Sequence, residues 1–243
     1  MADRHPCAMT DITIATVKDI DIAFEPWAWP FALERRGEID SHFAERCRER
    51  PGIWNGRVLL SHRHAVVDGR FRAACFEADY ASFLAWRDWK FPDRSVSNFF
   101  AAGALSASDG AYILGEMAPH TAVAGSIYFP AGTPEPDDIV AGRVDLAGNI
   151  ARELQEETGL EIAEFEAEPG WIEVVDRGYR VFIKPLTARV PADELRSRIL
   201  RHLANEPRPE FCKIHIVRGP IDLQPQMPDY VTAFLTDAWR RRS

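Results

Sequence analysis

Three glutamates, Glu153, Glu156 and Glu157, lie within five positions of the segment ARELQEETGL, residues 151–160. On an α-helix, which advances 100° per residue, their carboxylates share an arc of about 100°. The apolar stripe of the same helix falls immediately beside that arc, whereas an ordinary amphipathic helix places its charges opposite the core. The spacing therefore indicates a cluster of acids at the edge of a core, where a sheet or a loop can cover them.

Carboxylates at these spacings repel each other by about 0.2–0.5 kcal/mol per pair. No lysine lies at a position that would relieve the repulsion, and Arg152 can orient only one of the acids. A hard divalent cation such as Mg²⁺, which prefers oxygen ligands, is the natural counter-charge. It would also let a protein of net charge −8 bind an anionic substrate. The alternative is a solvated helix face without a function.

The ends of this helix are defined by the sequence, which predicts a helix over residues 146–158. Asp145 is well placed as the N-cap, and Gly159 follows the last turn, where a left-handed C-cap favours glycine. The loop FPAGTPEPDD, residues 129–138, lies just upstream and is rich in Gly and Pro. Such a loop can bring backbone atoms close to a ligand.

The segment from Arg152 to Leu160 resembles the second half of the Nudix box, R-E-U-x-E-E-x-G-U with U aliphatic, at all seven specified positions. The first half, G-x5-E-x7, fits only with an insertion. Five residues separate Gly132 from Asp138, but thirteen instead of seven separate Asp138 from Arg152. Counting back from Arg152 places Val144 at the first acid. The box is thus stretched by six residues, and Asp138 and Val144 compete for that position.

The resemblance implies a hydrolase that cleaves a nucleoside diphosphate linked to another group, with a mixed sheet between helices. Mg²⁺ or Mn²⁺ would bind the box glutamates, while Arg152 would hold Glu153 in place by a charge-assisted hydrogen bond. The metal would activate the water that attacks phosphorus. In this family the general base is either a box glutamate or an acid of a later loop, for which Glu210 and Glu206 are candidates. The resemblance makes Glu153, Glu156 and Glu157 the expected metal ligands in this sequence.

The stretched box and the N-terminal extension together are similar to the branch that includes UDP-sugar pyrophosphatases, so a UDP-sugar is one candidate substrate. Gly132 and Arg180 are the expected substrate-binding residues, and Trp171 and Tyr179 could stack on a base. For Arg180, Trp171 and Tyr179, the alternative is that the side chain packs in the core. Two other functions stay open. One is a Nudix-fold nucleotide-binding sensor or interaction module without catalysis, and the other is a (d)NTP housecleaning pyrophosphatase.

Strand and helix patterns alternate irregularly along the chain, which predicts an α/β protein with a mixed sheet and helices packed on it. The segment FPDRS, residues 91–95, is the predicted boundary between an N-terminal α/β subdomain, residues 1–95, and a Nudix domain, residues 96–243. Strands are expected in 10–26, 57–78, 97–117, 126–138, 170–186 and 211–217, and helices in 31–50, 80–90, 146–158, 191–204 and 227–239. Asp68-Gly69, Asp109-Gly110 and Arg177-Gly178 are the expected turns.

Composition limits the partners of the chain. Its 37 acidic and 29 basic residues argue against sequence-blind nucleic-acid binding. The longest apolar run, FFAAGAL, is far too short for a membrane span. The N-terminus lacks the apolar core of a signal peptide. We therefore expect a cytoplasmic protein with a small-molecule nucleotide substrate, and leave a homodimer open. No pair of its cysteines suggests a zinc site or a disulfide framework; they are Cys7, Cys47, Cys75 and Cys212.

Two histidine positions invite a chemical interpretation. His62 and His64 are expected on one face of a strand, but zinc would need a third ligand, so packing is favoured. Cys212 and His215 lack a third partner for nucleophilic catalysis and are interpreted as ordinary strand residues. The tryptophans of WAWP and AWRDWK are expected in a core or between subdomains.

Overall fold

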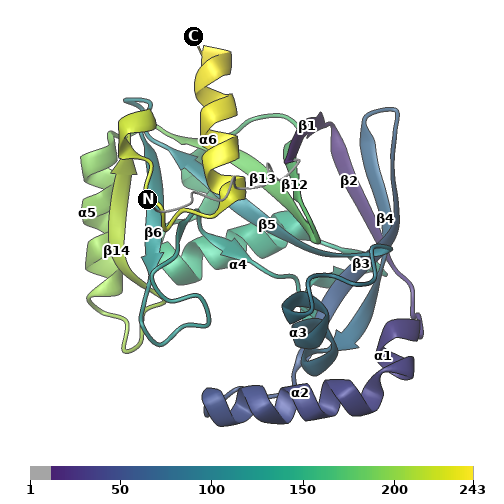
Figure 1. Ribbon diagram of the computed structural model, residues 1–243. Helices are drawn as coiled ribbons and strands as arrows, with labels where there is room; N and C mark the ends of the chain where they lie inside the picture. The colour runs from purple at the N-terminus through teal and green to yellow at the C-terminus, as the bar shows by residue number, and fades with distance from the viewer. Residues whose placement is uncertain (1–11, 243) are drawn as a thin grey trace, which may run out of the picture.

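The computed structural model describes residues 12–242, which form one continuous mixed sheet with helices on its faces (Figure 1). The predicted fold class, α/β with a mixed sheet between helices, is confirmed. Helices α4 and α5 pack on one face, where their apolar residues join the largest core cluster. Helix α6 covers the opposite face through a second cluster. Cys7 and the N-terminal segment considered for a signal peptide lie outside the described residues.

The elements follow the predicted order closely. The strands are β1 (Thr13–Val17), β2 (Asp19–Phe24), β3 (Arg57–Val67), β4 (Arg70–Asp79), β5 (Val96–Ser106), β6 (Tyr112–Met117), β7 (Ile127–Tyr128), β8 (Ala131–Gly132), β9 (Ile139–Val140), β10 (Arg143–Val144), β11 (Phe165–Ala167), β12 (Trp171–Asp176), β13 (Tyr179–Ala188) and β14 (Phe211–Val217). The α-helices are α1 (Pro30–Glu34), α2 (Arg36–Glu49), α3 (Tyr80–Asp88), α4 (Leu146–Thr158), α5 (Ala192–Leu203) and α6 (Asp229–Arg242). Three short 3-10 helices are η1 (Pro136–Asp138), η2 (Ile162–Glu164) and η3 (Pro220–Asp222).

Strand β5 positions the rest of the sheet. It pairs in parallel with β13 along its length, and its other edge changes partner from β3 to β8 and then to β6. The pairing with β8 matters for function, because Ala102 and Ala101 lie opposite Ala131 and Gly132 of the loop upstream of α4. The sheet therefore fixes the loop that faces the glutamate helix.

The N-terminal strands wrap back onto the rest of the sheet. Strand β1 pairs with β12, while β2 pairs with β4, β4 with β3, and β3 with β5. Since only Lys18 separates β1 from β2, these strands enclose a common interior. That interior contains Phe71 of β4 and Phe182 of β13, whose rings lie 4.8 Å apart. The predicted boundary falls directly before β5, and the division into two domains stays a prediction.

Two local predictions are wrong. The helix expected over 31–50 is two helices, because the backbone of Arg35 leaves the helical conformation between α1 and α2. His62 and His64 do not share a face, because β3 contains a bulge between His62 and Ala65. His62 is buried and stacks on Trp27, whereas His64 is exposed and its ring stacks on Phe71. An extra residue in one strand reverses which side the following side chains face.

None of the helices within residues 12–242 combines the length and the apolar composition that a membrane crossing requires.

Candidate metal and active site

Helix α4 runs over the predicted residues 146–158 and has both predicted caps. Asp145 Oδ1 accepts a hydrogen bond from the Gly148 N–H at 2.9 Å. Gly159 ends the helix in the left-handed conformation, with φ of 69°. Ile150 and Leu154 are buried against the sheet. The core stripe thus fixes the rotation of the helix, and with it the direction in which the three glutamates point.

The three acids differ in how deeply they are covered. Glu157 is 3% exposed, the Glu153 side chain is 16% exposed, and the Glu156 side chain is 60% exposed. Strand β8 provides the cover, because the Ala131 N–H donates to Glu157 Oε2 at 3.0 Å. A Cβ at Gly132 would lie 2.1 Å from Glu153 Oε1, so no other residue fits there without displacing the acid. The backbone of the upstream loop therefore lies close to the glutamates of α4.

Arg152 connects the acids of the helix to the loop before it. Its Nη1 lies 2.8 Å from Glu153 Oε1 and 3.4 Å from Glu156 Oε2. Its Nη2 lies 3.3 Å from Asp138 Oδ2. Asp138 also accepts a hydrogen bond from Asn149 Nδ2 at 3.1 Å. A half-exposed guanidinium thus holds Glu153 in one orientation and is itself held from the opposite side by Asp138.

The six-residue stretch in the box is a β-hairpin, formed by β9 and β10. Its turn residues, Ala141 and Gly142, both have positive φ, as a tight two-residue turn requires. The chain closes again at the base, where the Asp145 N–H donates to the Asp138 carbonyl at 2.9 Å. If residues 139–144 are set aside, the seven residues 145–151 separate Asp138 from Arg152, the spacing of an uninterrupted box. Val144 instead packs in the core.

Burial controls the electrostatics of the two covered acids. It raises the pKa of Glu153 to about 7, an effect that Arg152 opposes and the neighbouring acids reinforce. Burial raises the pKa of Glu157 well above its ordinary value, and the charge of Glu153 raises it further. The charge of Glu210 contributes to both shifts, so this residue lies near the pair. Glu206, the other late acid, follows the turn after α5, where its backbone N–H donates to the Leu203 carbonyl at 3.3 Å.

The donor atoms around α4 fit a hard divalent cation. Carboxylate oxygens are the ligands that Mg²⁺ and Mn²⁺ prefer. Within residues 12–242, Glu157 forms no ion pair, so its charge has no partner in the described part of the chain. No three His, Cys, Asp or Glu residues of that range converge on one point, because Arg152 draws Glu153 and Glu156 towards itself.

The residues expected to contact a base or a phosphate have packing partners. Arg180 is 8% exposed, pairs with Glu173, and lies 5.1 Å above the Phe71 ring. Tyr179 meets Phe91 edge to face at 5.3 Å. Trp171 is buried beneath Lys184, whose Nζ lies 5.2 Å from the ring centroid. Their geometry supports the packing alternative, and of the expected substrate-binding residues only Gly132 lies beside α4.

Strand β14 carries Cys212 and His215, as predicted. His215 Nε2 lies 2.9 Å from Glu116 Oε2, and Gln224 contacts its Nδ1 at 3.3 Å. Cys212 Sγ donates weakly to the Met117 carbonyl, so the two residues do not act on a common point.

Comparisons with known proteins match structures but not sequences. A scan against family models and a search of curated proteins both found no match. The structure is similar to the MutT protein from Methanosarcina mazei Go1, with 19% identity and a TM-score of 0.43, over 60% of this chain and 96% of that chain. It is also similar to a Nudix hydrolase from Nitrosomonas europaea (16%, TM-score 0.36, 60% and 90%). A third is the Nudix hydrolase RenU from M. smegmatis (14%, TM-score 0.35, 59% and 81%).

Because the TM-scores lie below 0.5 and the identities below 20%, the proposal that follows rests on the residues of the site.

Proposed function

We propose that the chain is a metal-dependent Nudix hydrolase that cleaves the diphosphate bond of a nucleoside diphosphate linked to another group. One observation carries the proposal. Glu157 is buried beside Glu153, and the described chain provides it with a backbone N–H but with no cation. A buried carboxylate without a counter-charge is costly, and such costs concentrate at functional sites.

Glu153, Glu156 and Glu157 would hold the cation, with Mg²⁺ or Mn²⁺ as the fitting ions. When bound, such an ion neutralises charge on the diphosphate and lowers the pKa of a water molecule. Arg152 fixes the orientation of Glu153, and Asp138 fixes Arg152 in turn. Asp138 takes the position of the first box acid, and the β9–β10 hairpin is an insertion in the box.

Glu210 is the proposed general base. It lies in the exposed turn before β14, and its charge reaches both Glu153 and Glu157. In the reaction, a water oxygen forms a bond to phosphorus while the bond from phosphorus to the bridging oxygen breaks. Glu210 accepts the proton of the water, and the leaving phosphate keeps the bonding electron pair. The products are two phosphate monoesters, or a monoester and a phosphorylated X group.

The proposed substrate class is a nucleoside diphosphate linked to another group. A UDP-sugar is the first candidate because of the stretched box and the N-terminal extension. The test is a screen of NDP-sugars, ADP-ribose, dinucleoside polyphosphates, coenzyme A, NADH and NTPs with Mg²⁺, with products identified by chromatography. The full chain is compared with Glu157→Gln and with Glu194→Gln, which changes an exposed acid on α5.

We expect product from the unchanged chain and from Glu194→Gln, and a loss of product with Glu157→Gln. Tight nucleotide binding without product at any metal concentration would identify a binding module instead. Release of inorganic pyrophosphate from an NTP, without action on NDP-sugars, would select nucleotide housecleaning.

A further inference from the structure

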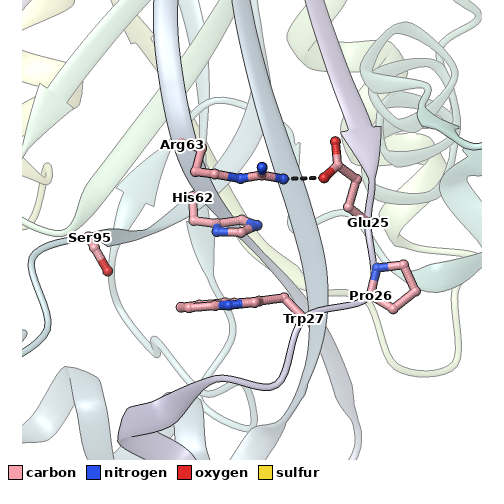
Figure 2. Close-up of a pocket in the computed structure, with 6 residues that line it drawn as sticks. All are labelled: Glu25, Pro26, Trp27, His62, Arg63 and Ser95. Atoms are coloured by element: carbon pink, nitrogen blue, oxygen red, sulfur yellow. Dashed lines mark hydrogen bonds and ion pairs between the residues drawn. The ribbon is translucent and has the colours of Figure 1, made fainter.

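A pocket of about 410 Å³ lies where the end of β2 and the middle of β3 meet the segment before β5 (Figure 2). This volume is within the range of about 300–1,000 Å³ that small-molecule sites occupy. The pocket is formed by residues outside the Nudix box. Its walls are Glu25, Pro26, Trp27, His62, Arg63 and Ser95.

His62 is the buried polar group of this pocket. It is 6% exposed, and its Nε2 has no hydrogen-bond partner among the described residues. The ring is held by Trp27, stacked at 4.5 Å and 15°, and by Phe76, edge-on at 5.4 Å. A buried polar atom without a partner costs about 1–3 kcal/mol. A ligand that bonds to this ring nitrogen would remove the cost.

The bulge of β3 turns Arg63 towards the same pocket. Arg63 has φ of 50°, which is uncommon for a residue other than glycine. Its guanidinium lies on the side of His62 opposite Trp27 and forms an ion pair with Glu25 (Figure 2). Arg63 and Glu25 thus cancel each other at the rim. Burial lowers the pKa of His62, which favours a neutral ring. The pocket offers polar edges and planar walls but no net charge.

The opposite wall is also fixed before any ligand arrives. Ser95 Oγ donates to Asp93 Oδ1 at 2.6 Å, and Trp29 Nε1 donates to Asp93 Oδ2 at 2.8 Å. The Asp93 carbonyl accepts from Trp86 Nε1 at 2.9 Å. Side chains locked in this way lose little freedom when a ligand binds, which favours affinity.

We propose that this pocket binds a neutral, planar heteroaromatic ring with hydrogen-bonding atoms on its edge, namely the base of a nucleoside. The unpartnered nitrogen of His62 would bond to the edge of the base, and Ser95 Oγ, whose own hydrogen is donated to Asp93, would accept a further hydrogen bond. The cancelled charges of Arg63 and Glu25 disfavour a phosphate or a carboxylate. This site is independent of the hydrolase reaction.

Isothermal titration of the full chain with adenosine, guanosine, cytidine and uridine tests the proposal. These nucleosides lack phosphate, so the acids of α4 do not attract them through a metal. We expect at least one of them to saturate a single site. His62→Phe retains a stacking ring but lacks the nitrogens, and it should weaken binding at least about tenfold. Glu157→Gln should leave the affinity unchanged.

A second measurement does not depend on a variant. The ¹⁵N chemical shift of His62 Nε2 should move when the bound nucleoside is added to the unchanged chain. Absence of saturation with all four nucleosides would overturn the proposal. So would equal affinity in His62→Phe, or binding of L-tryptophan, a zwitterionic aromatic ligand, without binding of any nucleoside.

Discussion

Glu157 and Glu173 are both buried, at 3% and 5% exposure, but the chain treats them differently. Glu173 of β12 forms an ion pair with Arg180 of the neighbouring strand, and that guanidinium also lies over the Phe71 ring. Glu157 of α4 receives one backbone hydrogen bond from Ala131, and no cation of the described chain reaches it. The first region contains its own counter-charge, whereas the second leaves room for one from solution.

This difference separates a structural charge from a functional one. A buried ion pair with both partners in the chain is satisfied at all times, and removal of one partner leaves a costly charge. A buried acid without a partner is held protonated until a cation arrives, as the raised pKa of Glu157 indicates. The two regions should therefore respond in opposite ways to neutralisation.

The largest effect is expected from Arg180→Met. It leaves Glu173 buried without a partner, so we expect a loss of about 3–5 kcal/mol in the free energy of unfolding. Chemical denaturation measures this loss. The double variant Arg180→Met with Glu173→Leu removes both charges and should recover most of it. A loss below about 1 kcal/mol in the single variant would contradict a structural role for Arg180 and would favour a contact with substrate instead.

The next prediction contrasts Glu157→Gln with Glu173→Gln, the same change in the two regions. For Glu157→Gln we expect hydrolysis to fall at least about 100-fold, since loss of a group that only supports a metal ligand already costs about 10–100-fold. Its thermal midpoint should not fall, because a buried acid without a counter-charge is replaced by a neutral amide. Glu173→Gln should lower the midpoint and leave the turnover per folded molecule unchanged. A lower midpoint in Glu157→Gln and a lower turnover in Glu173→Gln would contradict the roles assigned to these two acids.

The sequence predicts the α4 region well because its pattern is local. The bounds of the helix follow from the Asp145 cap and Gly159. The helical spacing shows which face of the helix carries the acids. The acids beside the core stripe are covered as expected, although Glu156 stays exposed. The segment from Ile139 to Val144 has β-branched residues around Ala-Gly, which is a signal for a hairpin. The Gly- and Pro-rich composition of the preceding loop obscured this signal.

The remaining features depend on contacts between distant segments. The bulge at Arg63 arises from how β3 pairs with β4 and β5, so strand alternation alone misplaces His64. The partner of Arg180 could not be inferred from spacing, because Glu173 lies across a turn on another strand. The cover of Glu157 by Ala131 requires β8 to pair with β5, a long-range contact of two residues.

A smaller effect is expected from metal binding to the unchanged chain. A cation that binds only the folded state at 100 times its Kd adds about 2.7 kcal/mol to the free energy of unfolding. Mg²⁺ or Mn²⁺ should therefore raise the thermal midpoint, and EDTA should reverse the rise. Glu157→Gln should abolish most of this response, while Arg180→Met with Glu173→Leu should retain it. Equal responses in both variants would place the metal elsewhere.

The smallest effect is expected at Asp138, which touches neither a metal nor a substrate in the proposed site and acts through Arg152. Asp138→Asn keeps the size of the side chain but removes the charge that holds the guanidinium. Because Arg152 is partly exposed, the loss should be about 1 kcal/mol, or roughly fivefold in kcat, with KM little changed. Asp137→Asn, an exposed neighbour, is the matched control and should have no effect. Asp138→Glu should restore the rate. A loss of kcat in Asp138→Asn no larger than in Asp137→Asn would contradict the assignment of Asp138 to the box position.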